Sequence, residues 1–401
     1  MLAAVGDPHR AVPVLHVAGT NGKGSTCATL DALLRAGGHR VGRYTSPHLV
    51  DFRERILVDG AAVAEDAVLG WLDAHQALIE RTGATFFEAT TVMAFDLLAR
   101  ARVDVAVIEV GLGGRLDATN VVEPLVAGIT GIGFDHMEFL GGSLAQIAAE
   151  KAGICKPGRP VVIGEPDPSV AAVLRAHAEA RGATPVTVVR ETWQLGQVTT
   201  DADGTVFEAG RRGEGVRSWR TPLIGEHQAR NALTALAMLE AAGPPWTLAP
   251  DRAAAALAGV RLAGRFQRVG PWLFDVAHNA DGAATVVDTL RRGAMGPGPL
   301  GAVVCVLRDK DWPRMLAALL PHVAHVWLTE APTAPPGRRW DLGEASRVAA
   351  GLGTGAVIHS EPSLDAALAA ARAACGTVLV TGSFHTVGDA MAALGIDPLS
   401  A

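Results

Sequence analysis

Short runs of valine, isoleucine and leucine recur along the first half of the chain, separated by longer alanine-rich stretches with apolar residues three and four positions apart. A short continuous apolar run is typical of a strand buried on both faces, and the three-to-four spacing is typical of a helix with one apolar face. The pattern predicts strands at residues 13–17, 103–110, 125–129 and 160–163. It predicts helices at residues 25–37, 65–81, 87–102, 144–152 and 169–181.

Strands that alternate with helices imply a parallel, doubly wound sheet. Residues 186–221 break this pattern with short polar pieces, which predicts a small antiparallel β appendage, and a helix is expected at 228–242. The alternation resumes with strands at 272–276, 302–307, 323–328 and 377–381. We therefore expect an α/β protein: a P-loop-type, mostly parallel N-terminal domain at residues 1–263 and a smaller Rossmann-like C-terminal domain at residues 264–401.

Composition narrows the function classes. The 401 residues include 35 Lys or Arg against 41 Asp or Glu, a net charge of −6 that argues against nucleic acid or an anionic membrane as partner. No apolar run is long enough to span a bilayer and the N-terminus lacks the pattern of a signal peptide, so a cytoplasmic location is expected. The four cysteines lie far apart, which favours buried thiols over a disulfide or zinc framework.

Lysine and asparagine are unusually scarce. Arginine outnumbers lysine 31 to four, and asparagine also occurs only four times. Residues that persist against such a bias are candidates for positions where chemistry requires them. They are Lys23, Lys151, Lys156 and Lys310, and Asn21, Asn120, Asn231 and Asn279.

The first predicted strand leads into a glycine-rich loop and then a helix, the context of a phosphate-binding loop. Residues 19–25 read GTNGKGS, a variant of the usual phosphate-loop sequence. Glycines allow backbone N–H groups to turn towards phosphates, Lys23 can reach the terminal phosphates, and the hydroxyl of Ser25 can face Mg²⁺. No guanine-recognition motif of the Asn-Lys-x-Asp type occurs in the chain, so ATP is the expected nucleotide.

Further motifs follow in order from residue 13 to about residue 388: YTSPHL at 44–49, ERI at 54–56, EVGLGGRLDATN at 109–120, DH at 135–136, EKAGI at 150–154, GEHQARN at 225–231, GRFQ at 264–267, DVAHN at 275–279 and TGSFHTVG at 381–388. This ordered set resembles the folylpolyglutamate synthase family of the Mur ligase superfamily. The form around residue 117 resembles bacterial members that also act as dihydrofolate synthases.

The resemblance implies an ATP-dependent ligase. Its expected partners are ATP, L-glutamate, dihydropteroate, and dihydrofolate or tetrahydrofolate; it releases ADP and phosphate after an acyl-phosphate intermediate, and the family suggests a monomer. Such chemistry must neutralise anionic reactants with metal ions and cationic side chains. The family pattern assigns contacts with Mg²⁺, two ions in all, to Ser25, Ser46, Glu109, His136 and Lys151.

Lys151 matches a family lysine that carries CO₂ as a carbamate and so becomes an anionic metal ligand. Carbamylation needs a neutral amine, so the site must lower the pKa of Lys151 by desolvation or nearby positive charge. Lys23, Lys151, His136 and Arg265 are the expected catalytic residues.

The remaining family positions bind the nucleotide and the pterin. ATP is matched to the loop residues Gly19, Thr20, Asn21, Gly22, Lys23, Gly24 and Ser25, and to Asn231, Arg265, Asp275 and His278. The pterin is matched to Thr85, Phe87, Asp117 and Ala118, although the residues alone favour a core position for Phe87. Residues 382–385 are one candidate region for glutamate.

Three alternatives stay open. The chain could make polyglutamates only, it could be another Mur-type amino-acid ligase, or it could be a nucleotide-dependent switch. A Mur ligase for nucleotide-sugar peptides usually adds an N-terminal domain, and only 12 residues precede Pro13 here. Relatives usually carry a few dozen more, so we expect a missing N-terminal helix or a late-assigned start.

Overall fold

The computed structural model describes residues 1–293 and 299–400. Its first part is an eight-stranded sheet in the order β4-β3-β2-β5-β1-β6-β7-β8. The strands are β1 Val14–Ala18, β2 Val41–Tyr44, β3 Ile56–Val58, β4 Ala61–Ala62, β5 Val105–Glu109, β6 Val126–Ile129, β7 Val161–Ile163 and β8 Val186–Val188. Six of them run parallel, and β3 and β4 add an antiparallel edge.

Helices cover both faces of this sheet. They are α1 Lys23–Ala36, α2 Glu65–Thr82, α3 Phe86–Arg100, α4 Met137–Leu140, α5 Leu144–Lys151, α6 Pro168–Ala180, α7 Val189–Thr192, α8 Glu226–Ala242 and α9 Pro250–Leu257. Leu15 and Val17 of β1 pack towards α1 and α8, whereas Ala18 packs with α5 and α6 on the other face. Short 3₁₀ helices lie at Leu2–Val5, Pro8–Arg10, Phe52–Arg55, Ala118–Val121 and Ala152–Ile154.

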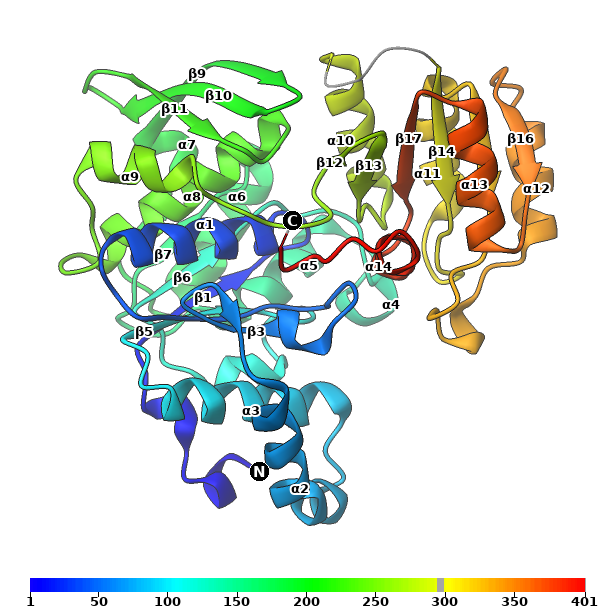
Figure 1. Cartoon of the computed structure of the whole chain (residues 1–401). Coiled ribbons are helices and arrows are strands. Elements are labelled where there is room, and N and C mark those ends of the chain that lie inside the picture. Colours follow the sequence, from blue (N-terminus) through cyan, green and yellow to red (C-terminus); the bar gives the residue numbers. More distant parts are fainter. Residues whose placement is uncertain (294–298, 401) are drawn as a thin grey trace.

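A separate three-stranded antiparallel sheet lies over α8 at the top of Figure 1. Its strands are β9 Trp193–Asp201, β10 Gly204–Arg211 and β11 Arg217–Thr221. The buried rings of Trp193, Phe207 and Trp219 join it to the core beneath. The appendage predicted for residues 186–221 therefore exists, but it begins later than expected.

The C-terminal domain is built on a six-stranded sheet in the order β12-β13-β17-β14-β15-β16, with β12 antiparallel to the rest. The strands are β12 Gln267–Val269, β13 Trp272–Asp275, β14 Leu300–Val304, β15 His325–Leu328, β16 Val357–Ser360 and β17 Thr377–Thr381. The helices are α10 Ala280–Arg291, α11 Trp312–Leu319, α12 Leu342–Gly351, α13 Leu364–Ala374 and α14 Phe384–Ala393, with 3₁₀ turns at Leu320–His322 and Pro336–Arg338.

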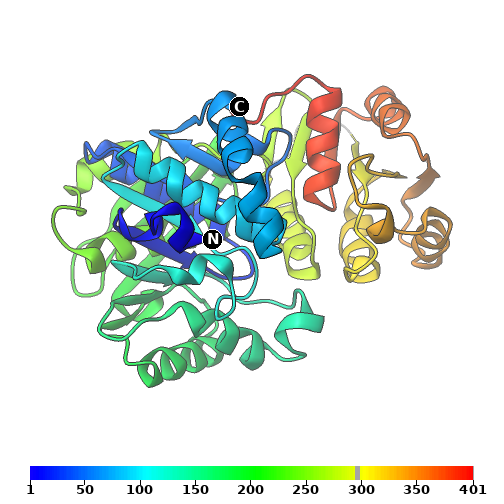
Figure 2. The same ribbon diagram turned by 90° about the horizontal axis from the view of Figure 1, so that it is seen from below.

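The two α/β domains lie side by side, and the first helix and strand pair of the C-terminal domain, α10 and β13, faces the N-terminal domain (Figures 1 and 2). In the large sheet β1 sits between β5 and β6, so the chain reverses direction across the sheet at β1. Ligands of doubly wound sheets bind at the carboxyl ends of the strands beside such a reversal. The loops after β1, β5 and β6 are therefore the expected walls of a site.

The predicted elements are present within a few residues, but the pattern did not detect strands β2, β3, β4, β12 and β16, and one assignment needs correction. Strand β2 was missed because its middle is Gly42 and Arg43, and the buried Arg43 is tolerated through an ion pair of 3.7 Å with Asp31 on α1. Residues 186–188 were assigned to the antiparallel appendage, but they form β8 and pair in parallel with β7 in the large sheet.

Two further predictions concern membrane-spanning helices and the state of the cysteines. Among the described residues, no helix combines the length and apolar character needed to cross a bilayer. All four cysteines are buried free thiols, as expected.

Candidate active site

The glycine-rich loop between β1 and α1 lies on the floor of a cavity of about 450 Å³. Gly22 has a φ of +93°, and a Cβ there would lie 2.4 Å from Oδ1 of Asn231 on α8. Only glycine allows this loop to approach α8 so closely. The backbone N–H of Thr20 donates to the carbonyl oxygen of Gly131 at 2.8 Å, which fixes the loop to the segment after β6.

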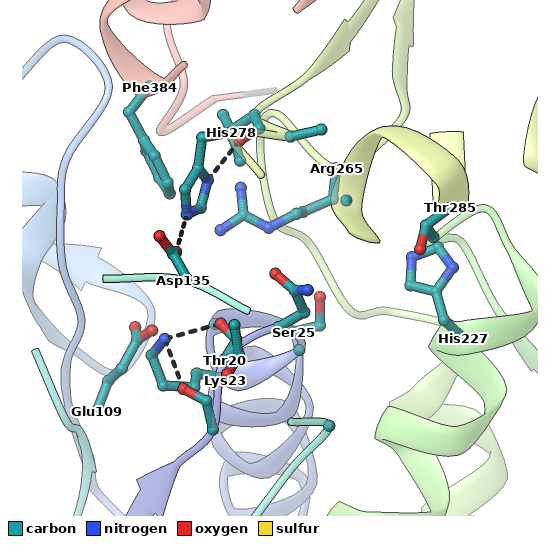
Figure 3. A pocket seen from close by; sticks show the side chains of 18 of the residues that line it. Thr20, Lys23, Ser25, Glu109, Asp135, His227, Arg265, His278, Thr285 and Phe384 are labelled. Carbon is teal, nitrogen blue, oxygen red and sulfur yellow. Dashed lines mark hydrogen bonds and ion pairs between the residues drawn. The ribbon is translucent and has the colours of Figure 1, made fainter. Parts of the chain in front are cut away.

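Lys23 begins α1 and curls back over the loop (Figure 3). Its ammonium donates to the carbonyl oxygens of Gly19 and Thr20, each at 3.2 Å. Ser25 is buried in the first turn of α1, and it also lines the cavity. A cation and a helix N-terminus thus meet at one point, which favours an anionic ligand.

Glu109 is the last residue of β5 and faces this loop from the neighbouring strand. Burial raises the pKa of its carboxyl, and the positive charges of Lys23 and Arg265 act in the opposite direction. One carboxylate oxygen accepts from the backbone N–H of Ser46 at 3.3 Å. Glu109 and Ser46, predicted from motifs 63 residues apart, are therefore in contact.

Lys151 ends α5 and is 4% exposed. Burial, assisted by the positive charge of Lys23, lowers the pKa of its amine to about 7. The amine donates to the carbonyl oxygen of Gly19 at 2.8 Å. A lysine with this pKa is neutral in about half of the molecules at neutral pH, which is the condition for a nucleophilic amine.

His136 follows Asp135 in the loop after β6, which we call the 131–136 loop. Burial lowers the pKa of His136 to about 4, so its ring is neutral. Its Nε2 atom lies 3.2 Å from the ammonium of Lys310, which belongs to the C-terminal domain. A metal ion could bind Nε2 only if this ammonium moved away.

The C-terminal domain adds the other wall. Asp275 ends β13, and its carboxylate accepts from the backbone N–H groups of Phe266 and Ala277, both at 2.8 Å. Burial raises the pKa of Asp275 to about 6 against the opposing charge of Arg265. The guanidinium of Arg265 lies 5.2 Å from the centre of the Phe384 ring, and Arg265 lines the same cavity as Asn231 and His278.

The four predicted pterin residues do not share one cavity. Thr85 caps α3 and lines a second, mostly apolar cavity of about 570 Å³, together with the exposed Phe86. Phe87 instead packs on Tyr44, with ring centres 6.2 Å apart. Asp117 holds its own turn by accepting from the N–H groups of Leu112 and Thr119, and Ala118 begins the 3₁₀ helix beside it.

Sequence reasoning missed several cavity residues. Asp135 was quoted only as part of a motif, and Lys310 was noted for its rarity without a role. Both side chains are nearly buried and form an ion pair at 2.5 Å. Other lining residues without a predicted role are His227, Gln228, Thr285, Thr289 and Arg338. The scarcity of lysine pointed to Lys310, and the motifs at 135–136 and 225–231 contain Asp135, His227 and Gln228 without assigning them a role.

Hard metal ligands are present without a complete metal cage. Among residues 1–293 and 299–400, no group of three or more His, Cys, Asp or Glu side chains is arranged to hold an ion. Mg²⁺ commonly uses one or two carboxylates and completes its shell with phosphate oxygens and water. Glu109 with the hydroxyls of Ser25 and Ser46 fits that pattern.

Comparison with family models finds two matches. Residues 17–239 match the Mur ligase middle domain. Residues 264–384 match the Mur ligase, glutamate ligase domain. Together they span most strands of the three sheets and all residues that line the cavity except His385.

Individual proteins are similar over nearly the whole chain. The dihydrofolate synthase/folylpolyglutamate synthase of Escherichia coli is 37% identical over 383 residues, which is 94% of this chain and 86% of that protein. Folylpolyglutamate synthase of Mycobacterium tuberculosis complexed with ADP and AMPPCP has a TM-score of 0.89 at 36% identity, covering 99% of this chain and 94% of that one.

Two further structures carry other ligands. The Escherichia coli protein in complex with DHPP and ADP has a TM-score of 0.87 at 33% identity, with 98% and 91% of the chains covered. A bifunctional folylpolyglutamate synthase/dihydrofolate synthase with Mn, AMPPNP and L-glutamate bound has a TM-score of 0.84 at 34% identity, with 98% and 93% covered.

Proposed function

The chain belongs to the dihydrofolate synthase/folylpolyglutamate synthase family of Mur ligases, and on this premise we propose how its residues carry out the reaction. The protein is an ATP-dependent ligase that joins L-glutamate to dihydropteroate and to reduced folates. The observation that carries the assignment is the single cavity of about 450 Å³ between the domains, where the phosphate loop, Glu109, Lys151, Arg265 and Asp275 meet.

The proposed reaction begins with transfer of the terminal phosphoryl group of ATP to the carboxylate of the dihydropteroate or folate substrate. Lys23 at the phosphate loop and Arg265 from the other domain neutralise the phosphates, which otherwise repel the attacking carboxylate. The amine of glutamate then attacks the acyl phosphate, an amide bond forms, and phosphate leaves. The walls of both domains exclude water, which would otherwise hydrolyse the acyl phosphate.

Asn231 and Asp275 are proposed to hold the adenine and the ribose. Asn231 lies against Gly22 of the phosphate loop, so a base held there is close to the phosphates. Asp275 lies at the carboxyl end of β13, where its oxygens face the cavity. A carboxylate at this position can accept hydrogen bonds from two ribose hydroxyls.

The family uses a divalent metal, and we propose Mg²⁺ held by Glu109, Ser46 and Ser25. Bound Mg²⁺ would neutralise phosphate charge and polarise the transferred phosphoryl group. His136 is the weaker candidate ligand because its Nε2 atom faces Lys310.

We propose that Lys151 carries a carbamate. Its neutral amine attacks the carbon of CO₂, an N–C bond forms, and one proton is released to solvent. The nitrogen keeps one hydrogen, which can still donate to the carbonyl oxygen of Gly19, while the new carboxylate supplies anionic oxygen ligands. The test is the activity of Lys151→Ala with and without short carboxylates: full activity of the variant without them would overturn the carbamate.

For the pterin we propose the region between Thr85, Phe87, Asp117 and Ala118, close to the apolar cavity beside α2 and α3. Aromatic rings there can stack on a pterin, and a carboxylate can accept from its amino group. Ser383, Phe384 and His385 line the cavity edge on the C-terminal domain and are proposed to bind glutamate. The boundary between residues 263 and 264, the monomeric state and the cytoplasmic location stay predictions.

The decisive experiment measures ADP release with each acceptor. Release that requires both glutamate and either dihydropteroate or tetrahydrofolate supports the ligase and compares its two activities. ADP release that is independent of the acceptor, or absent with both, would contradict it. Glu109→Gln is the matched variant of strongly reduced activity, and Arg314→Met, at a surface residue 77% exposed in its side chain, is the control that should retain activity.

A further inference from the structure

The carboxylate of Asp135 belongs to the N-terminal domain, yet three side chains of the C-terminal domain contact it. The ammonium of Lys310 lies 2.5 Å from one oxygen. His278 Nε2 lies 3.2 Å from the other oxygen, and the side-chain amide of Asn279 donates to it at 3.4 Å. Asp135 is therefore a point where the two domains are joined by charge and hydrogen bonds.

These contacts reach Asp135 from two separate loops that follow strands of the six-stranded C-terminal sheet. His278 and Asn279 follow β13, whereas Lys310 follows β14, and β17 lies between those strands. The two segments converge on one carboxylate, so Asp135 ties both loops of the C-terminal domain to the same point of the N-terminal domain. Figure 3 shows His278 reaching down to Asp135 beside Arg265.

The same loop is fastened to the phosphate loop on its other side. The hydroxyl of Thr20 donates to the carbonyl oxygen of Gly133 at 3.1 Å. The amide of Asn279 also donates to Oδ1 of Asn21 at 3.2 Å. Bringing the C-terminal domain onto Asp135 therefore sets its nucleotide-binding segment against the loop that receives the phosphates.

Burial makes the pair dependent on both partners. The side chains of Lys310 and Asp135 are 7% and 8% exposed, so each charge has little access to water. When one partner of a buried pair is removed, the remaining charge loses its compensation, which costs far more than loss of a surface pair. If the C-terminal domain rotated away from the N-terminal domain, both charges would be exposed to water again. The ion pair therefore forms only when the two domains close on each other.

We propose that Lys310 and Asp135 form an interdomain latch that positions the C-terminal domain over the phosphate loop. Both are positioning residues: they hold Arg265, Asp275 and His278 in place for the nucleotide. The latch deepens the proposed function and rests on it. It assigns a role to the one cavity lysine that the family motifs leave without one.

Closure can be measured without the ligase reaction. Because the four native cysteines are buried, single dyes can be placed selectively on Glu80→Cys in α2 and Arg347→Cys in α12, two exposed positions on different domains. The labelled protein and its Lys310→Met, Asp135→Asn and double variants are titrated with AMPPNP and Mg²⁺. Fluorescence energy transfer between the two dyes reports the distance between the domains. Lys310→Arg tests rescue by the conserved charge, and Arg314→Met is the surface control.

The latch predicts that each single variant needs about tenfold more AMPPNP for half-maximal closure, and that the double variant is no worse than either single one. Lys310→Arg should recover most of the loss, and Arg314→Met should match the parent. Closure of both single variants at the parent's concentration would overturn the latch, and so would additive effects in the double variant. Asp135→Asn keeps the shape of the side chain and carries the test if Lys310→Met does not fold.

Failure of the latch and failure of the ligase assignment are distinguishable. Closure with AMPPNP is read whether or not ADP release depends on glutamate and a pterin. In the reacting enzyme, the latch predicts a raised KM for ATP in Lys310→Met, with recovery in Lys310→Arg. A purely structural role would instead lower the melting temperature and leave the nucleotide dependence of closure unchanged.

Discussion

Replacing Lys151 by methionine should make the protein less active and more stable, and the gain in stability should shrink as the pH rises. The amine is 4% exposed, and burial lowers its pKa from 10.5 to about 7. In the unfolded chain it regains its ordinary pKa. Between those two values the unfolded state binds more protons than the folded state, so this lysine destabilises the fold most at low pH.

The pKa difference sets the magnitude. With 1.36 kcal/mol for each pKa unit, the penalty is about 5 kcal/mol near pH 6 and about 2 kcal/mol near pH 9. Methionine removes the penalty and loses the hydrogen bond to Gly19, which is worth about 1 kcal/mol. The net gain in the free energy of unfolding is therefore about 4 kcal/mol near pH 6 and about 1 kcal/mol near pH 9.

Scanning calorimetry of both proteins in CO₂-free buffer measures this difference. For a protein of this size, the gain of about 4 kcal/mol in the free energy of unfolding corresponds to a rise in Tm of roughly 5 to 7 °C near pH 6. Near pH 9 the rise falls to about 1 or 2 °C. Arg314→Met provides the baseline for the effect of pH on a surface substitution. A Tm difference that stays constant from about pH 6 to pH 9 would refute a lowered pKa at Lys151, because changes in packing do not depend on pH.

Three other perturbations follow from the same structure. Glu109→Gln should lower kcat about a hundredfold and weaken the binding of Mn²⁺, which electron paramagnetic resonance measures. An unchanged Mn²⁺ affinity would contradict the role of Glu109 as a metal ligand. Arg265→Lys should reduce kcat/KM for ATP at least about tenfold, measured by ADP release, because an ammonium cannot reproduce the guanidinium contacts. Burial lowers the pKa of His16 to about 3, so the protein loses stability as the pH falls below about 6.5, by about 2 kcal/mol at pH 5. Between pH 7 and pH 5 the Tm of His16→Gln should therefore fall less than the Tm of the parent. An equal fall in both proteins would contradict the lowered pKa of His16.

The apolar pattern predicted four strands of the large sheet, β1, β5, β6 and β7, because these strands are buried on both faces. Each detected strand is a short run of Val, Ile or Leu, and β1 and β5 are buried at every position. Strand β2 escaped because Arg43 interrupts the run, and its burial depends on Asp31, which lies on another element. A pattern along one segment cannot report a partner that the fold supplies.

Membership of a sheet was harder to predict than the existence of a strand. Residues 186–188 form three positions of β8, too few to show whether they alternate. Their neighbour β7 determines that they pair in parallel in the large sheet. Within residues 1–293 and 299–400, the three cis bonds at Ser46–Pro47, Thr184–Pro185 and Pro244–Pro245 likewise have no signal in the hydrophobic pattern.

Motifs located candidate site residues on both domains, but they did not reveal which side chains meet across the domain boundary. Glu109 at the end of β5 and Lys23 in the phosphate loop could each be read from local context. Asp135 and Lys310 are 175 positions apart, and neither belongs to a pattern that names the other. Only the folded arrangement of both sheets brings them within 2.5 Å.

The scarcity of lysine has a physical explanation in this arrangement. Three of the four lysines, Lys23, Lys151 and Lys310, line the same cavity, and Lys156 donates to the carbonyl oxygen of Asn120 at 2.9 Å. Arginine cannot replace a lysine whose amine is proposed to become neutral, and it replaces only in part a lysine whose compact ammonium lies between a carboxylate and an imidazole. A chain that otherwise prefers arginine 31 to four would therefore retain lysine at such positions. This reasoning ranks the sites: Lys151→Arg should abolish activity because a guanidinium does not carry CO₂, whereas Lys310→Arg should weaken the latch only in part.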